Sequence, residues 1–287
     1  MIGRLASLAV ALTLLVAAGG HTQTAPPRRI VSVVPAVTEM LFAMNAGSRV
    51  AGVSRFDHDP PEVERLPKVG GLLDPDVERI LSLRPDLVIV YGTQAELRQQ
   101  LDRASVPCFA YTHAGLPDIT RTIREVGERI GARADAERLA TRIEHELDAI
   151  RAHVASRPRP RTLLVFGRES LALRGIDASG GVGFLHDLLE LAGGADVFGD
   201  VARESVRAST ETIIARAPEV IVELHYGAGL RPDQIPRERQ VWSALASVPA
   251  VRNGRVHLLI GDEFVIAGPR IVEAARRLAQ ALHPEVY

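Results

Sequence analysis

The chain has 287 residues, of which 46% are hydrophobic, and its formal net charge is −1. So many apolar residues exclude a disordered chain, and the near-zero charge argues against a general nucleic-acid binder or a membrane-surface binder. The single cysteine, Cys108, excludes an intrachain disulfide, and its apolar neighbours favour a buried structural thiol.

The N-terminus has the layout of a secretory signal peptide. One early cation, Arg4, precedes an uncharged run from Leu5 to Ala18, and a polar, proline-containing stretch follows. The run has 14 residues, fewer than the roughly 20 that a transmembrane helix needs. We expect residues 1–25 to be a signal peptide, and the mature protein to be periplasmic or otherwise exported after cleavage. An uncleaved membrane anchor is the alternative.

Strand and helix patterns alternate from residue 26 to residue 134, which predicts an N-terminal α/β lobe. Strands are predicted at 30–34, 49–54, 87–90 and 108–111, and helices from residue 36, over 76–83 and over 95–104. The strands are continuous apolar runs, as expected for a mainly parallel sheet that is covered on both faces. The prolines and glycines between residues 55 and 71 exclude regular structure throughout that segment.

The middle of the chain contains no strand pattern. Between Pro117 and Val154, apolar residues recur at steps of three and four, which is typical of helices. A helix over about 135–155 would be about 30 Å long at 1.5 Å per residue. The stretch "SRPRPR" then ends it. We interpret residues 135–157 as a bridging helix between two lobes.

The α/β pattern restarts in residues 158–287, which predicts a C-terminal lobe. The predicted elements are strands at 162–166, 220–224 and 255–260 and helices over 183–194, 211–215 and 268–282. Pro269 is expected in the first turn of the last helix, where a missing amide proton is tolerated.

One short phrase occurs twice, as "VERILSLRPDLVIVYG" at 77–92 and "TETIIARAPEVIVELH" at 210–225. Each copy has a glutamate, an isoleucine two residues later and a proline seven residues after the glutamate, followed by an acidic residue and an apolar run. We interpret the phrase as the same helix–strand unit in each lobe. A ligand site is expected in the cleft between the lobes, at the C-terminal ends of parallel strands.

Enzyme motifs are missing from the sequence. It has no G-x-S-x-G elbow, no H-E-x-x-H pair, no P-loop and no complete G-x-G-x-x-G after a strand. This favours a binding protein without a catalytic cofactor over an enzyme. An exported enzyme that processes metals or tetrapyrroles is the alternative.

Four stretches in order carry a resemblance to a known family: "RIVSVVPAVTE", "GVSRFDHDPP", "VERILSLRPDLVI" and "DEFVIAGPRI". With them, the mature chain resembles the substrate-binding proteins of ABC importers for cobalamin, haem and ferric siderophores, and the cobalamin branch most of all. The resemblance implies an α/β fold of two Rossmann-like lobes with mainly parallel sheets, joined by a single long backbone helix. It also implies a monomer that delivers a metal chelate to an ABC permease dimer in the inner membrane.

The same resemblance suggests ligand-binding residues in the cleft. By position it points to Pro35, Phe56, Tyr91, Asp262 and Phe264. Core packing is the alternative for Phe56 and Phe264. The sequence differs from cobalamin receptors at Leu72 and Ser205, where they carry tryptophans, and at Ile266, where they carry a basic residue. The ligand is therefore expected to be a cobalt corrinoid, haem or a ferric chelate.

Strand ends add further candidates. Arg168 follows a predicted strand and could pair with an anionic group of the ligand, or form a surface salt bridge. His225 ends another strand, and His58 lies in "FDHDPP"; either could bind a metal, because imidazole suits iron, cobalt and zinc. Solvated histidines are the alternative.

Glu78 and Glu211 occupy equivalent places in the two copies of the repeated phrase. The resemblance implies that they dock onto the permease, one on each subunit. A favourable interaction between a carboxylate and the N-terminal dipole of its own helix is the alternative.

Overall fold

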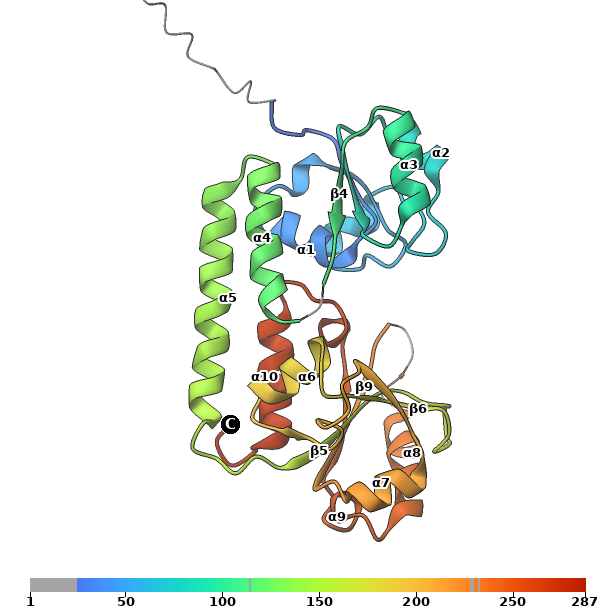
Figure 1. Cartoon of the computed structure of the whole chain (residues 1–287), viewed down its shortest axis with the longest axis vertical. Helices are drawn as coiled ribbons and strands as arrows, with labels where there is room; N and C mark the ends of the chain where they lie inside the picture. The colour runs from blue at the N-terminus through green and yellow to red at the C-terminus, as the bar shows by residue number, and fades with distance from the viewer. Residues whose placement is uncertain (1–24, 114, 228–229, 232) are drawn as a thin grey trace, which may run out of the picture.

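The computed structural model describes residues 25–113, 115–227, 230–231 and 233–287 (Figure 1). The predicted signal peptide lies almost wholly outside this range. Two sheets form two lobes that are stacked along the long axis, and the long helix α5 (Arg133–Val154) runs beside both. This arrangement confirms the predicted fold class. We call the part around the four-stranded sheet lobe one and the part around the six-stranded sheet lobe two.

Lobe one contains a parallel sheet in the order β2-β1-β3-β4. Its strands are β1 (Ile30–Ser32), β2 (Val50–Val53), β3 (Leu87–Tyr91) and β4 (Cys108–Tyr111). The β1 residues and the first four residues of β3 are all buried, as continuous apolar runs predict. The helical segments of this lobe are α1 (Pro35–Ala43), η1 (Gly47–Arg49), η2 (Pro61–Arg65), α2 (Val77–Ser82) and α3 (Ala95–Arg103).

Lobe two contains a sheet in the order β10-β9-β5-β6-β8 with β7 also paired to β5. Its strands are β5 (Arg161–Gly167), β6 (Ile176–Ser179), β7 (Ala195–Asp196), β8 (Ser205–Ala208), β9 (Val220–His225) and β10 (Val256–Ile260). The three strands predicted here are parallel to one another, whereas β6 and β8 are antiparallel additions at one edge.

The other helices of lobe two are α6 (Phe184–Leu191), α7 (Thr210–Arg216), α8 (Ile235–Gln240), η3 (Val241–Leu245), α9 (Pro249–Arg252), η4 (Asp262–Phe264) and α10 (Ile271–Leu282). The last helix begins at Ile271 with Arg270 as its N-cap. Pro269 therefore precedes the helix instead of lying in its first turn, which corrects the expected start. In the described part of the chain, no helix has both the length and the hydrophobicity needed to span a bilayer.

The helix α5 provides the surface on which both lobes pack. Its apolar residues recur at helical spacing and are buried, from Leu139 and Ile143 through Leu147 and Ile150 to Val154. They belong to one hydrophobic core that also contains the β1 and β3 residues of lobe one and the α10 residues of lobe two. At 1.5 Å per residue, α5 is about 33 Å long. Helix α4 (Pro117–Arg129) packs along it from lobe one.

The six-stranded sheet separates two cores because side chains alternate across a strand. In β9, Val220 and Val222 face the core that α5 shares, whereas Ile221 faces a second core around the fully buried Trp242. Strand β5 follows the same rule with Leu164 and Leu163.

The two copies of the repeated phrase have the same local structure. The N-caps Asp76 and Ser209 each accept a hydrogen bond from the amide three residues on, and Ile80 and Ile213 are fully buried. Arg84 and Ala217 both have positive φ angles, of 48° and 46°, immediately before the prolines. The interpretation of the phrase as the same helix–strand unit in each lobe is therefore confirmed.

The acidic residue after each proline has the same function in both copies. The Asp86 carboxylate accepts hydrogen bonds from the Arg28 and Arg29 amides, just before β1. The Glu219 carboxylate accepts one from the Arg161 amide, at the start of β5. Each unit is thereby joined to the first residues of the neighbouring central strand.

Candidate functional site

A pocket of about 410 Å³ lies between the lobes, where β3 and β4 end. Both lobes line it: Pro35, Ala36, Tyr91, Gly92, Thr93, Tyr111, Thr112 and His113 from lobe one, and Val265, Ile266 and Ala267 from lobe two. Larger hollows of about 490 and 720 Å³ are lined by several charged residues and lie away from these strand ends. The interlobe pocket is thus where a parallel α/β sheet is expected to bind its ligand.

Two tyrosines end neighbouring strands and meet in this pocket. Tyr91 of β3 and Tyr111 of β4 are register partners, and their ring centroids are 6.0 Å apart in an edge-on arrangement. Burial raises the pKa of Tyr91 to about 12, and it raises the pKa of Tyr111 further. Both phenols are therefore protonated at neutral pH and can donate hydrogen bonds.

His113 continues this row of rings toward lobe two. Its imidazole is stacked on Tyr111 at 6.2 Å and meets the edge of Phe184, the first residue of α6, at 5.3 Å. Burial lowers the pKa of His113, so the ring is neutral at pH 7. Neither ring nitrogen has a hydrogen-bond partner among the described residues. The ring thus presents a neutral nitrogen lone pair.

The lobe-two wall is apolar and carries no charge. Val265, Ile266 and Ala267 follow η4, and none of the described residues that line the pocket is an arginine or a lysine. Just beyond this wall, Arg270 forms a bidentate ion pair with Glu39 of α1. The pocket is therefore uncharged, with an interlobe ion pair next to it.

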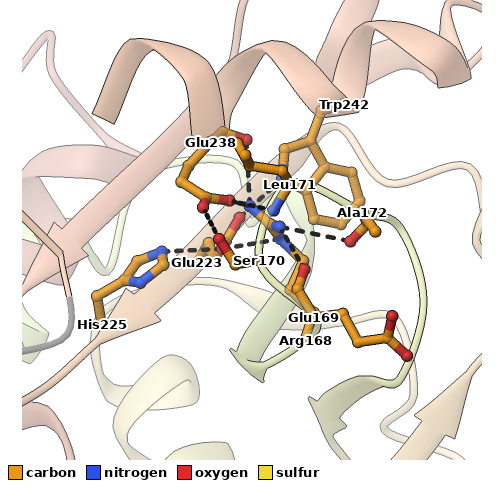
Figure 2. A network of polar contacts seen from close by, with 9 residues as sticks. All are labelled: Arg168, Glu169, Ser170, Leu171, Ala172, Glu223, His225, Glu238 and Trp242. Carbon is orange, nitrogen blue, oxygen red and sulfur yellow. Dashed lines mark hydrogen bonds and ion pairs between the residues drawn. The ribbon is translucent and has the colours of Figure 1, made fainter. Parts of the chain in front are cut away.

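A smaller pocket of about 240 Å³ lies in lobe two, at the ends of β5 and β9. Beneath it, the Arg168 guanidinium is only 2% exposed and pairs with Glu223 at 2.9 Å and with Glu238 at 2.8 Å (Figure 2). Ser170 also donates to Glu238, and the Trp242 indole N–H donates to Glu223 at 2.8 Å. The structure thus gives Arg168 a buried structural role, with its charge compensated by two carboxylates.

His225 is the exposed edge of this network. Its Nε2 lies 2.8 Å from Glu223 Oε1, and its side chain is 21% exposed toward the smaller pocket (Figure 2). A carboxylate in this position fixes the orientation of an imidazole. Arg168 and His225 are thus close to each other, but they line a different pocket from Tyr91.

The remaining ligand candidates lie in neither pocket. Phe264 is fully buried, with the Arg277 guanidinium 4.9 Å from its ring centroid, which matches the core-packing alternative. Asp262 accepts a hydrogen bond from the Gly227 amide at 2.6 Å. Phe56 is 56% exposed and covers Gly71.

The part of the chain that the structure describes contains no metal-binding cluster. No group of three or more His, Cys, Asp or Glu side chains there is placed to hold an ion. His58 is exposed and its Nδ1 lies 2.9 Å from Glu64.

Glu78 and Glu211 lie in the first turns of α2 and α7, one on each lobe. Both are exposed. Interaction with the helix dipole and docking are both compatible with these positions.

Of the predicted ligand-binding residues, Pro35 and Tyr91 line the interlobe pocket; Tyr111, His113, Val265 and Ala267 also line it and were not predicted. A signal for Tyr111 was present, because "LVIVY" and "CFAY" are parallel neighbours that both end in tyrosine. The segment 265–267 enters the pocket from the other lobe, and no local pattern marks it.

Comparisons with known proteins agree on one family. A sequence profile described as periplasmic binding protein matches residues 30–262. The vitamin B12-binding protein of Salmonella typhimurium is 30% identical over 256 residues, which cover 88% of this chain and 90% of that protein. An uncharacterized ABC transporter substrate-binding lipoprotein of Bacillus subtilis is 26% identical and covers 91% of this chain, with 82% of its own length matched.

A solved structure is similar along nearly the whole chain. The periplasmic heme-binding protein from Roseiflexus sp. RS-1, in its apo form, superimposes with a TM-score of 0.77 at 28% identity. The match covers 91% of this chain and 99% of the heme-binding protein.

Proposed function

This chain belongs to the periplasmic binding protein family, and from that membership we propose that it is the substrate-binding component of an ABC importer whose ligand is a metal-centred tetrapyrrole. The ligand is captured between the lobes and delivered to the permease without being chemically changed. Export across the inner membrane, with residues 1–25 as the signal, is part of the proposal.

The interlobe pocket is the observation that carries this function. Its walls come from both lobes, and Tyr91, Tyr111 and His113 form a row of rings along one wall. Aromatic rings suit a large planar ligand, because flat surfaces can lie against each other and each ring can bury roughly 150–250 Å² of apolar surface. Contact with both lobes also makes ligand binding sensitive to their spacing.

A corrinoid is the first candidate ligand. Its periphery carries neutral amides, whereas haem carries two carboxylates. The described lining of the pocket provides no cation for carboxylates but does provide two protonated phenols and the hydroxyls of Thr93 and Thr112 for amides. The similarity to vitamin B12-binding proteins supports the same choice.

Haem is the second candidate, and His113 is the observation that favours it. Its neutral imidazole, next to two tyrosines, is of the residue type that holds haem iron. The similarity to a heme-binding protein supports this alternative.

Equilibrium titration distinguishes the two ligands. We expect cyanocobalamin or cobinamide to bind with a Kd below the micromolar range, as measured by calorimetry, and haemin to bind more weakly. Replacing Tyr91 or Tyr111 by alanine should weaken corrinoid binding about tenfold or more, because each ring contributes a buried aromatic face.

Two variants complete this test. Tyr287→Ala removes a half-exposed tyrosine that contacts His153 of α5, and it should leave binding unchanged. If haemin binds more tightly and its Soret band shifts on binding, and His113→Ala abolishes that shift, haem replaces the corrinoid as the ligand. If neither a corrinoid nor haem binds below the micromolar range, the proposed ligand class is wrong, whether or not a ferric hydroxamate binds.

A further inference from the structure

Arg270 connects the two walls of the interlobe pocket. It is the N-cap of α10, three residues after the pocket residue Ala267. Its Nη2 donates to Glu39 Oε1 at 2.6 Å and its Nε to Oε2 at 3.2 Å. Glu39 lies on α1, one turn after the opposite wall residues Pro35 and Ala36. The ion pair therefore joins the elements that support both walls.

One guanidinium faces three carboxylates. Besides Glu39, Asp59 Oδ1 lies 3.6 Å from Nε, and Glu263 Oε2 lies 3.7 Å from Nη1. Glu39 and Asp59 belong to lobe one, whereas Glu263 belongs to lobe two. The other charged groups packed around this cluster are Asp57, Lys68 and Arg277. Negative charge from both lobes thus converges on one cation.

The backbone of lobe two approaches the same carboxylate closely. A Cβ atom at Gly268 would lie 2.8 Å from Glu39 Oε2, so the segment before α10 runs directly against the Glu39 side chain. Glu39 itself is 5% exposed. Because the buried Glu39 carboxylate lies against both Arg270 and the Gly268 backbone, its position sets the separation of α1 from the segment 265–268.

We propose that Arg270 is a positioning residue that fixes the spacing of the two lobes, by neutralising carboxylates that would otherwise repel each other across the cleft. Removing one partner of a buried ion pair leaves the other charges uncompensated. Without Arg270, Glu39 and Asp59 would face Glu263 with only Arg277, the partner of Glu263 in its own lobe, left as a cation. The lobes would then separate at a pH where Glu39 is ionised.

This mechanism predicts that the spacing of the lobes in a variant without Arg270 depends on the protonation of Glu39. When Glu39 is neutral, its repulsion with the carboxylates of lobe two is absent, and a variant without the cation should return to the original spacing. A role of Arg270 in packing alone would not depend on pH. Burial raises the pKa of Glu39 to about 7 even with Arg270 present, and because Arg270 lowers this pKa, the variant without Arg270 needs a pH well above 7 to ionise Glu39.

The experiment measures the distance between the lobes without any ligand. Spin labels on Glu78→Cys and Glu211→Cys report one exposed helix of each lobe, and Cys108→Ala removes the only native cysteine. At pH 9.5, where Glu39 is ionised in the variant as well, Arg270→Gln should add a population with a longer distance, as measured by double electron–electron resonance. At pH 5, the distribution should return to that of the parent protein.

Two further variants make the result specific. Arg277→Gln removes a guanidinium of similar exposure on the same helix, whose carboxylate partner Glu263 belongs to its own lobe, and it should not change the distance. Arg270→Lys keeps the charge but cannot form the bidentate pair, so it should give a smaller long-distance population than Arg270→Gln. If Arg270→Gln does not fold, Arg270→Lys carries the test.

Unchanged distances in both Arg270 variants, or a longer distance that persists at pH 5, would overturn the proposal. A consequence for ligand release rests on the proposed function: the dissociation rate should rise on the order of tenfold in Arg270→Gln at pH 9.5. Because the distance measurement needs no ligand, a wrong ligand class and a wrong role for Arg270 give different results.

Discussion

At the scale of single residues, the buried carboxylates near the cleft are the least expected feature. Glu39 and Asp57 are 5% and 1% exposed. Burial raises their pKa values to about 7 and about 6, against opposing interactions with Arg270 for Glu39 and with Thr38 and Ser54 for Asp57. Both groups therefore bind their protons more tightly in the folded chain than in the unfolded chain.

This difference predicts a pH-dependent stability. The contribution of the two protonated groups to folding stability is fully present below about pH 4. It is lost as the pH rises through 6 and 7, because ionising these groups costs more free energy in the folded state than in the unfolded state. The stability lost is on the order of 3 kcal/mol for each group. We expect the Glu39→Gln/Asp57→Asn variant to be more stable than the parent at pH 8 and to lose this advantage at pH 4, in urea unfolding at both pH values.

The exposed residue Glu137 is the control for this prediction. Its pKa is lowered by a hydrogen bond from Arg124, so Glu137→Gln should not become more stable at pH 8. An equal stability difference between the double variant and the parent at both pH values would contradict the assigned titration.

Sequence reasoning at this scale depends on distance along the chain. Tyr91 could be predicted because it ends its own strand. The environment of Arg168 could not, because its two carboxylate partners lie 55 and 70 residues away and reach it only through the fold. The same applies to Glu39 and Arg270, which are 231 residues apart.

At the scale of elements, the repeated helix–strand unit makes Glu78 and Glu211 equivalent. Both are exposed in the first turn of a short helix, one on each lobe. We propose that they dock onto the permease. The Glu78→Arg/Glu211→Arg variant should abolish transport in a reconstituted uptake assay and leave the ligand Kd unchanged, because a positive charge replaces the carboxylate at each proposed contact, away from the ligand pocket.

The matched control for docking is Glu96→Arg, which reverses an exposed charge in the first turn of α3. It should transport normally. Transport by the double variant at the parent rate would rule out the docking role.

Elements that form a continuous apolar run or a long helical pattern could be predicted, and β3, β4 and α5 lie where expected. The strands β6 and β8, "IDAS" and "SVRA", could not. They are short and contain polar residues, and they are strands because β6 pairs antiparallel with β5 and β8 pairs antiparallel with β6. Tertiary pairing of this kind leaves no local pattern.

At the scale of the whole molecule, the two lobes are not independent in their packing. One hydrophobic core extends from the β3 residues through α5 to α10. The alternation of strands and helices predicted two lobes, but it did not predict that they share a core.

The shared core predicts that the protein unfolds in one step. We expect a single thermal transition with equal van't Hoff and calorimetric enthalpies. Ile143→Ala on the buried face of α5 should destabilise the whole molecule by about 2–5 kcal/mol, whereas Thr141→Ala on its exposed side should have little effect. Two resolved transitions in calorimetry would contradict this prediction.

The near-identity of the two repeated units also bears on how the protein would meet a two-fold symmetric receptor. The two-fold symmetry of such a receptor makes two orientations of the bound protein, related by half a turn, identical. This degeneracy is worth RT ln 2, about 0.4 kcal/mol of association free energy. The near-identity of the two repeated units gives each receptor subunit a similar contact point, so the two single charge reversals, at Glu78 and at Glu211, should slow delivery to the same extent.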